Sequence, residues 1–295
     1  MLDGFTPRTV NLGDIEIFCR VAGSGSPVLL LHGFPETHVM WHRIAPQLAR
    51  NHTAVCADLR GYGASSAPDS APDHAPYSKR VMGEDMVRLM RELGYPRFGV
   101  VGHDRGGRVA YRMALDHPEH IAWLAALDII PTSEVFARAD ARLILAFWPW
   151  SLLAQDAPLP EKLLLAAPDA IVSDALGSWG SDPEAFPAEV REAYIAALRN
   201  PASVHAICEE YRAAASIDTA LDRQDLAEGR RIECPTLVLW SKDSGLDTWY
   251  AEAGGPLAIW RRWAGNVSGK AIAGGHFFPE QNVEDTLAEL LAFIA

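Results

Sequence analysis

An aspartate in a glycine-rich turn is the residue of this sequence best suited to covalent chemistry. Asp104 stands in the stretch 102–108, Gly-His-Asp-Arg-Gly-Gly-Arg, between an apolar run at 98–101 and a helical pattern at 108–117. This order predicts a strand, a sharp turn and a helix, with Asp104 at the apex of the turn in an unusual backbone conformation. A carboxylate held there can attack a carbon atom and form an alkyl-enzyme ester. The alternative is a surface aspartate in an ordinary strand-to-helix turn.

The turn resembles the nucleophile elbow of the α/β-hydrolases, Gly-x-nucleophile-x-Gly, with aspartate where esterases and lipases carry serine. The resemblance implies the chain order nucleophile, acid, histidine. His276, in the loop Gly-Gly-His-Phe-Phe at 274–278, stands where that order places a histidine. We therefore predict His276 as the general base that activates water. A serine-type esterase is excluded because the elbow carries no serine.

Two aspartates could orient His276. Asp128 ends the apolar pattern at 124–127, and Asp243 follows the strand pattern that ends at Trp240. Both stand at the carboxyl ends of predicted parallel strands, where sites form in open α/β sheets. Asp128 is favoured because its neighbours are apolar, so its charge needs a partner. Asp243 lies in a polar turn where water can solvate it.

Two arginines follow the aspartate on the same helix face. Arg105 and Arg108 are spaced i, i+3 on the first turn of the predicted helix. Cations at a helix N-terminus oppose the macrodipole, and a carboxylate bound by both guanidinium groups compensates for that. We predict that they bind a small anionic substrate beside Asp104. The alternative is pairing with the protein's own acidic side chains.

The rest of the chain supplies a frame for these residues. Apolar runs alternate with helical patterns, which predicts an α/β fold: a mostly parallel central sheet flanked by helices. Between 132 and 221 the pattern is helical, rich in tryptophan and proline, with no convincing strand. We therefore predict a core formed by 1–131 and 221–295 with an inserted helical cap at 132–220. The expected elements are a hairpin at 9–21, strands at 27–33, 54–59, 98–101, 122–130, 235–240 and 270–273, and helices at 38–50, 78–93, 108–117 and 283–294.

Composition narrows the function classes. The net charge of −12 disfavours nucleic acid and anionic membrane surfaces as partners. No apolar run approaches the roughly 18 residues that span a bilayer, and no export signal is visible at the N-terminus. The four cysteines are scattered without disulfide or metal spacing, which predicts reduced thiols, no metal or cofactor, and a cytoplasmic protein.

Over nearly its full length the chain resembles the fluoroacetate and haloacetate dehalogenases of the α/β-hydrolase superfamily. The elbow string is specific, because related epoxide hydrolases usually carry tryptophan where this chain has Arg105. The resemblance implies that Asp104 displaces a halide from the α-carbon while Arg105 and Arg108 hold the carboxylate. Water activated by His276 then opens the ester and releases glycolate. The matching motifs are His-Gly-Phe-Pro at 32–35, Ala-Asp-Leu-Arg-Gly-Tyr-Gly at 57–63, the elbow at 102–108, Glu-Glu-Tyr-Arg-Ala at 209–213 and Gly-His-Phe at 275–277.

The same resemblance implies further roles. The N–H groups of Phe34 and Arg105 form the oxyanion hole. Trp150 and Tyr211 match the family's halide pocket, but the pocket's histidine position holds Pro149, which has no side-chain donor and no N–H. Because fluoride depends most on strong donors, we expect chloro- and bromo-acids to be better substrates than fluoroacetate. The aromatic cluster at 147–150 could also be mere hydrophobic core of the cap.

Two other functions stay open. An epoxide hydrolase shares the Asp-His-Asp set and needs acidic donors such as Tyr211 and Tyr194, although a neutral epoxide has no use for two arginines. A ligand-binding member of the fold would keep the pocket without turnover. Members of the family are often homodimers, so the resemblance also suggests a homodimer.

Overall fold

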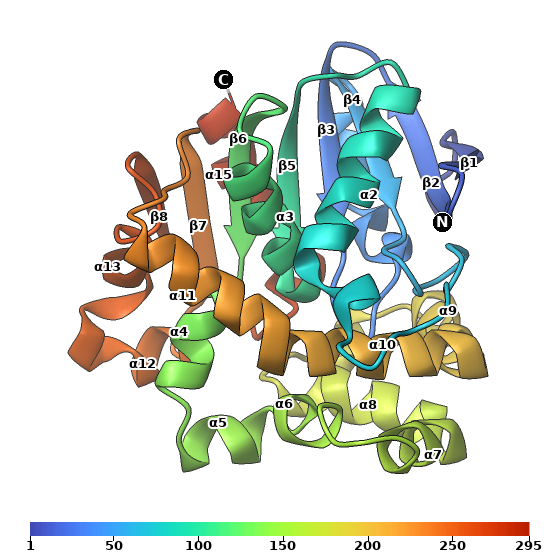
Figure 1. The fold of residues 1–295 in the computed structure, drawn as a ribbon. Coiled ribbons are helices and arrows are strands. Elements are labelled where there is room, and N and C mark those ends of the chain that lie inside the picture. The colour runs from blue at the N-terminus through green and yellow to red at the C-terminus, as the bar shows by residue number, and fades with distance from the viewer. Residues whose placement is uncertain (295) are drawn as a thin grey trace.

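The apolar runs of the sequence form one sheet of eight strands, in the order β1-β2-β4-β3-β5-β6-β7-β8 (Figure 1). The computed structural model describes residues 1–294, for Pro183 the backbone alone. β1 and β2 form an antiparallel hairpin, β2 pairs antiparallel with β4, and all other neighbours are parallel. The predicted mostly parallel α/β sheet is confirmed. The strands are β1 (Thr6–Asn11), β2 (Glu16–Gly23), β3 (Ser26–Leu31), β4 (His52–Ala57), β5 (Phe98–His103), β6 (Ile121–Leu127), β7 (Thr236–Ser241) and β8 (Val267–Ile272).

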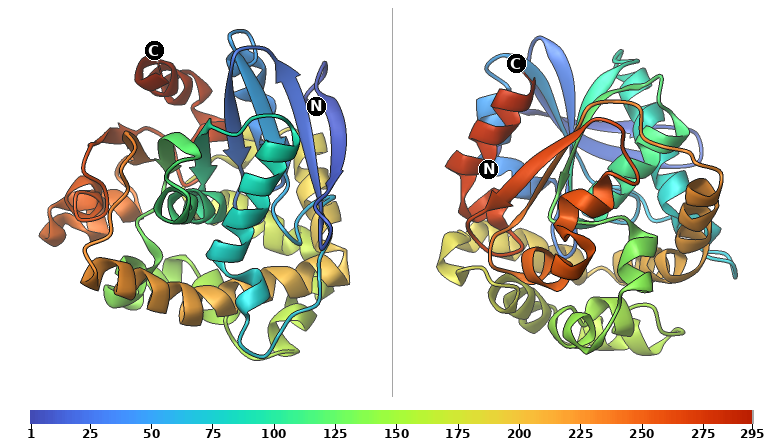
Figure 2. Two further views of the ribbon diagram at one scale, coloured as in Figure 1. Left: turned by 45° about the horizontal axis from the view of Figure 1, so that its top comes forward. Right: turned by 90° about the vertical axis from the view of Figure 1, so that its left-hand side faces the viewer.

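Helices cover both faces of the sheet. α2 and α3 lie on one face and α15 on the other (Figures 1 and 2). The inner parallel strands β3, β5, β6 and β7 are therefore shielded from water on both sides, which is why they are mostly apolar, whereas the edge strand β8 is partly exposed. The helices of this part are η1 (His38–His42), α1 (Ala45–Leu48), η2 (Ala75–Tyr77), α2 (Lys79–Glu92), α3 (Asp104–Asp116), α12 (Gly245–Trp249), η5 (Ala251–Ala253), α13 (Gly255–Trp260), α14 (Phe278–Gln281) and α15 (Val283–Ile294).

Between β6 and β7 every described element is a helix. These helices lie across the carboxyl ends of the parallel strands and form a layer of their own (Figures 1 and 2). The helical layer consists of α4 (Thr132–Ala137), α5 (Ala141–Ala146), α6 (Pro149–Leu152), α7 (Leu159–Ala166), α8 (Pro168–Ser178), η3 (Pro183–Ala185), α9 (Ala188–Leu198), α10 (Pro201–Ala213), the π-helical turn η4 (Ala214–Asp218) and α11 (Thr219–Ala227).

Three local expectations were wrong. The helix expected at 38–50 is two short pieces, since Pro46 has no N–H to continue a helix and instead stands in the first turn of α1. The helix after the elbow begins at Asp104 itself rather than at Arg108. Two helices between β7 and β8, α12 and α13, were not expected at all. They are only five and six residues long, too short for a clear periodicity.

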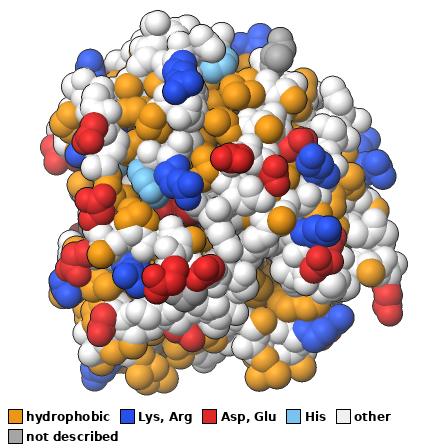
Figure 3. All heavy atoms as spheres, turned by 180° about the vertical axis from the view of Figure 1, so that it is seen from behind, with side chains coloured by type: hydrophobic (Ala, Val, Ile, Leu, Met, Phe, Trp, Pro, Cys, Tyr) orange, Lys and Arg blue, Asp and Glu red, His pale blue; other side chains and the backbone are white. Residues whose placement is uncertain are grey.

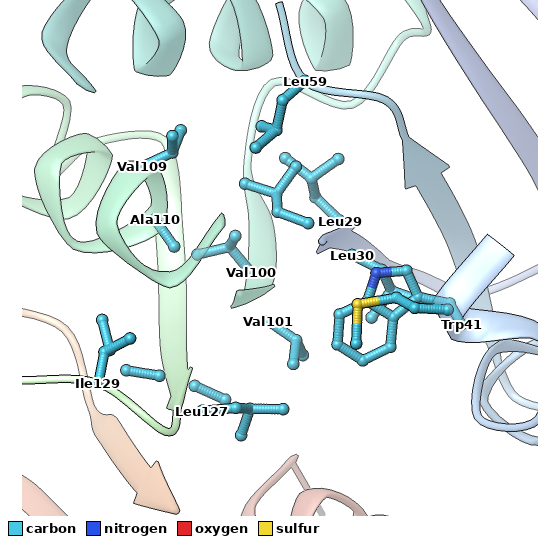
Figure 4. Close-up of a cluster of buried hydrophobic side chains, with 14 of the residues drawn as sticks. Leu29, Leu30, Trp41, Leu59, Val100, Val101, Val109, Ala110, Leu127 and Ile129 are labelled. Atoms are coloured by element: carbon cyan, nitrogen blue, oxygen red, sulfur yellow. The ribbon is translucent and has the colours of Figure 1, made fainter. Parts of the chain in front are cut away.

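The core lies between the sheet and its helices. Leu29, Leu30, Val100 and Val101 come from the central strands, and Trp41 and Val109 pack near them from η1 and α3 (Figure 4). All six side chains are fully buried. This packing fixes β3 and β5 side by side, so the loops that follow them are held at one edge of the sheet.

The surface carries scattered charges of both signs, with hydrophobic side chains gathered at the edge formed by the helical layer (Figure 3). The most exposed of these are Leu145, Leu159, Ile144 and Leu163. Among the described residues, no helix has the length and apolar character needed to cross a bilayer.

Candidate active site

Asp104 lies at the junction of β5 and α3 with a φ of 43°, a left-handed conformation that few side-chain-bearing residues adopt. Close backbone approaches hold it there. A Cβ on Gly106 would stand 2.4 Å from the carbonyl oxygen of His32, and a Cβ on Gly33 would stand 2.5 Å from the Cβ of Asp104. Only glycine fits at either position, so the strained turn depends on the loop after β3 as well as on its own residues.

The loop after β3 also contacts the carboxylate. The N–H of Phe34 donates to Oδ2 of Asp104 at 3.1 Å. Phe34 itself is fully buried. Its N–H is therefore already directed at the oxygen that would become negatively charged if the carbonyl carbon of an Asp104 ester were attacked.

His276 and Asp128 lie next to each other at the same edge of the sheet. Nδ1 of His276 donates to Oδ2 of Asp128 at 2.6 Å. The other oxygen, Oδ1, accepts from the N–H and the hydroxyl of Ser241 at 2.7 and 2.8 Å. The hydrogen bond from Nδ1 fixes the tautomer and leaves Nε2 as an acceptor. Asp243 lies exposed in its own turn, so of the two candidate acids the structure brings Asp128 to the histidine.

The two arginines are unequal. The Arg105 guanidinium pairs with Glu210, with Nε donating to Oε1 at 2.8 Å. Glu210 also forms an ion pair with Lys79 at 2.7 Å. Arg108 donates through Nη1 to the carbonyl of Ile130 and the hydroxyl of Thr132, both neutral. Among the described residues, Arg108 forms no ion pair.

Free donors remain on both arginines. Nη1 of Arg105 and Nε of Arg108 are buried without a hydrogen-bond partner. Arg105 lies 3.9 Å from the ring centre of Tyr211, and Arg108 lies 4.5 Å from that of Trp150. Burying a charged N–H donor without a hydrogen-bond partner costs free energy. An anion bound beside these two guanidinium groups would accept from the free donors and would therefore be stabilised.

The electrostatics keep Asp104 ionised. Burial raises the pKa of its carboxyl, but the charges of His276, Arg105 and Arg108 outweigh burial and hold the pKa below its usual range. Burial together with Arg105 lowers the pKa of Arg108, the direction expected for a cation that lacks a carboxylate partner.

A small cavity of about 30 Å³ connects these groups. That is room for about two water molecules. Arg108 lines it, but Arg105 does not and lies behind Tyr211. Tyr194 lies elsewhere and donates to Glu280. The lining side chains include Asp104, Arg108, Asp128, His276, Trp150, Tyr211, Pro149, Phe147, Trp179, Leu246, Trp249 and Tyr250.

A second group of buried residues supports the site and was missed from the sequence. His103 donates through Nδ1 to Glu36 at 3.0 Å and through Nε2 to the carbonyl of His276 at 2.9 Å. Glu36 also accepts from the N–H of Gly33 at 3.1 Å. Burial lowers the pKa of His103, but Glu36 reverses this and raises it to about 9. The sequence offered a signal for both residues, since His103 lies within the elbow motif and Glu36 directly follows the motif at 32–35.

Three loops are therefore tied together by one buried pair, His103 and Glu36. No group of three His, Cys, Asp or Glu side chains suited to a metal ion occurs in the part of the chain that the structure describes. The arrangement offers a nucleophilic carboxylate, a histidine oriented by an acid, and cationic donors around one small cavity.

Comparison with known proteins gives a consistent picture. The family model described as alpha/beta hydrolase fold matches residues 26–275. A fluoroacetate dehalogenase from Burkholderia sp is 46% identical over 100% of this chain and 95% of its own. A soluble epoxide hydrolase from Corynebacterium sp. (strain C12) is 30% identical, covering 93% of this chain and 92% of its own. A solved structure from Nostoc sp PCC 7120, provisionally described as an alpha/beta hydrolase, is 45% identical and superposes with a TM-score of 0.95, covering 100% of this chain and 99% of its own.

Proposed function

The chain belongs to the alpha/beta hydrolase fold family, and from that premise we propose that it is a hydrolytic dehalogenase of small 2-haloacids. The reaction converts a haloacetate to glycolate and halide through an ester of Asp104. Residues 1–131 and 221–295 are assigned to the catalytic core and 132–220 to a cap that closes the site, and the second boundary falls inside α11.

In the first step, an oxygen of the Asp104 carboxylate attacks the α-carbon of the haloacid. The new C–O bond forms as the carbon–halogen bond breaks, and the halide leaves with the electron pair. Arg108 holds the substrate carboxylate from the cavity wall and the free Nη1 donor of Arg105 supports it from behind, which aligns the α-carbon with the nucleophile. Trp150 and Tyr211 donate to the departing halide.

In the second step, His276 takes a proton from water, and the hydroxide formed attacks the carbonyl carbon of the Asp104 ester. Asp128 stabilises the histidine cation that results. The N–H groups of Phe34 and Arg105 stabilise the oxyanion. As it collapses, His276 returns its proton to the departing alkoxide oxygen, which releases glycolate. The Asp104 carboxyl then loses a proton to solvent and is restored as the carboxylate. The 3.1 Å contact from Phe34 to Asp104 supports this assignment.

One observation carries the choice of substrate: Arg108 is a buried cation that lines the cavity beside Asp104 and has only neutral partners. The carboxylate of a haloacid supplies the missing negative charge. A neutral substrate would give the guanidinium no anionic hydrogen-bond partner, and the nearby charge of Asp104 is lost when the ester forms.

The leaving-group side of the cavity supports a preference among halides. Pro149 lines the cavity and offers no donor at the position where the family's halide pocket carries histidine. Losing one donor to a leaving group costs on the order of 3 kcal/mol, or about a hundredfold in rate. Chloro- and bromoacetate are therefore better substrates than fluoroacetate.

Two measurements test the proposal. In heavy-oxygen water under single-turnover conditions, chloroacetate should give glycolate without label, because the first oxygen transferred belongs to Asp104. Label in the first-turnover product would rule out Asp104 as nucleophile. Parallel assays with chloro- and fluoroacetate should show faster chloride release, and equal or faster fluoride release would refute the halide preference.

Epoxide hydrolysis is the second candidate, since the Corynebacterium relative is a soluble epoxide hydrolase and Tyr211 lines the cavity. Tyr194, the other tyrosine considered, is bound to Glu280 and does not line this cavity, which weakens that candidate. Diol formation from styrene oxide, with no halide released from any haloacid, would favour it.

A further inference from the structure

A second cavity of about 150 Å³ adjoins the small one. The two share six lining residues: Asp128, Phe147, Trp179, Leu246, Trp249 and His276. The second cavity reaches the surface at Ser178 and Gly180, both of which are exposed. The shared side chains therefore form a thin partition between the cavity that holds Asp104 and Arg108 and a second, larger cavity that reaches the surface.

The partition is built around Trp249. This residue ends α12 and is half-buried, with its ring edge-on to Phe147 at a centroid distance of 5.8 Å. The ring lies close against Gly245, where a Cβ would stand 2.9 Å from the ring atoms. Leu246, from the first turn of the same helix, lines both cavities beside it. The indole is therefore one of the side chains that line both cavities, and it is packed against the glycine that begins its own helix.

The position of α12 is fixed relative to the catalytic acid. Asp247 accepts from the indole N–H of Trp240 at 2.8 Å and from the N–H of Asp243 at 3.0 Å. Ser241, at the start of the same loop, donates to Asp128. The loop that orients Asp128 therefore also positions α12 and Trp249, so the partition is held in place by the same contacts as the catalytic acid.

We propose that Trp249 determines substrate specificity by excluding haloacids whose α-carbon carries a substituent longer than a methyl group. Its indole blocks the passage from the small cavity into the second cavity. This inference rests on the proposed dehalogenase function. With the indole removed, the α-substituent of a longer acid extends into the second cavity while its carboxylate still binds Arg108.

The test compares bromoacetate with α-bromobutyrate, whose α-carbon carries an ethyl group. For Trp249→Ala we expect the kcat/KM for α-bromobutyrate, relative to that for bromoacetate, to rise about tenfold or more, the range that a hydrophobic pocket reaches for one or two extra carbons. Leu246→Ala should shift the ratio in the same direction. Trp249→Phe keeps a ring in the partition and should leave the ratio near that of the unmodified protein.

Leu145→Ala, which removes an exposed leucine of α5, is the matched control and should not change the ratio. Calorimetric binding of acetate and of butyrate tests the role of the partition without any catalytic turnover. In Trp249→Ala the ratio of the affinity for acetate to the affinity for butyrate should fall about tenfold. Ratios within twofold of the unmodified protein in both alanine variants would overturn the inference. Absence of bromide release from bromoacetate by the unmodified protein would instead count against the proposed function, and the binding ratios would still decide the role of Trp249.

Discussion

Two arginines three residues apart have different roles because their surroundings differ. Arg105 is neutralised by Glu210, and although burial lowers its pKa, that carboxylate reverses the effect and raises it. Arg108 has no such partner among the described residues and lines the cavity. In the proposed reaction Arg108 is therefore the main binding charge, and Arg105 adds a free Nη1 donor from behind.

Replacing Arg108 tests this difference. For Arg108→Leu we expect kcat/KM for chloroacetate to fall about a hundredfold or more, because losing one partner of a buried charge pair costs about 2–5 kcal/mol. Most of the loss should appear in KM. Turnover of chloroacetamide, which has no carboxylate, should change little. Arg223→Leu, on the exposed face of α11, is the control, and an equal loss with both substrates would contradict a carboxylate-binding role.

His103 makes the stability of the protein dependent on pH. Its pKa is about 9 when folded, against about 6.5 for an unfolded histidine, because Glu36 favours the charged form. A raised pKa stabilises the folded state fully below about pH 6.5, and this stabilisation is lost as the pH rises through 9.

We expect the contribution to be on the order of 3 kcal/mol. Denaturant unfolding of the unmodified protein and of His103→Gln, at about pH 6 and about pH 10, measures it as a difference between the two proteins. The unmodified protein should lose its advantage at the higher pH. Free energies of unfolding that differ by the same amount at both values would show that His103 does not carry this charge.

At the scale of elements, the proposed nucleophile Asp104 is positioned by contacts between loops that are distant in the sequence. The turn between β5 and α3 leaves Asp104 at a positive φ, and the loop after β3 approaches so closely that Gly33 can carry no side chain. His103 and Glu36 then tie these two loops to the loop of His276. Strain at Asp104 persists because neighbouring elements hold it from several sides.

A methyl group on Gly33 should therefore damage catalysis more than folding. In Gly33→Ala the new Cβ would stand 2.5 Å from the Cβ of Asp104, so the carboxylate must move. We expect an activity loss of about a hundredfold, since small displacements of reacting groups cost that much, and a stability loss of about 1–3 kcal/mol from overpacking. Mass spectrometry of the Asp104 ester and thermal unfolding measure the two effects. Gly265→Ala has no atom within 4 Å of its new Cβ and should leave both unchanged.

For the whole molecule, a buried charge cluster joins the sheet layer to the helical layer. Glu210 of α10 accepts ion pairs from Lys79 of α2 and Arg105 of α3, and the Tyr62 hydroxyl donates to its second oxygen. Burial raises the pKa of Glu210, but Arg105 and Lys79 outweigh burial and lower it to about 2. The helical layer is therefore attached to the sheet by an ion cluster that also neutralises Arg105.

Removing the charge of Glu210 should loosen this attachment. For Glu210→Gln we expect the free energy of unfolding to fall by about 3–5 kcal/mol, because Arg105 loses its ion-pair partner inside the protein and Lys79 keeps only its 3.5 Å contact to Asp218. Denaturant unfolding measures the loss, with Glu233→Gln at an exposed site as the control. A stability equal to that of the control variant would show that the cluster does not hold the layers together.

The sequence by itself determined the strand and helix alternation, the nucleophile turn and the general place of the site. These are local signals: apolar runs and small residues around Asp104 are read within a short window, and parallel strands bring their carboxyl ends to one edge whatever the details of packing. His276 could be predicted for the same reason, from its place after the last strand.

Only the tertiary structure decided how the candidates are used. Tertiary contacts bring Asp128 rather than Asp243 to His276. They also pair Arg105 with Glu210 and leave Arg108 without an acidic partner among the described residues. The tertiary structure also placed Trp249 in the lining of two adjoining cavities. Each of these outcomes depends on contacts between residues more than 100 positions apart, or on helices too short to show a period. Such contacts are set by packing and by the balance of buried charge, which no local pattern in the chain encodes.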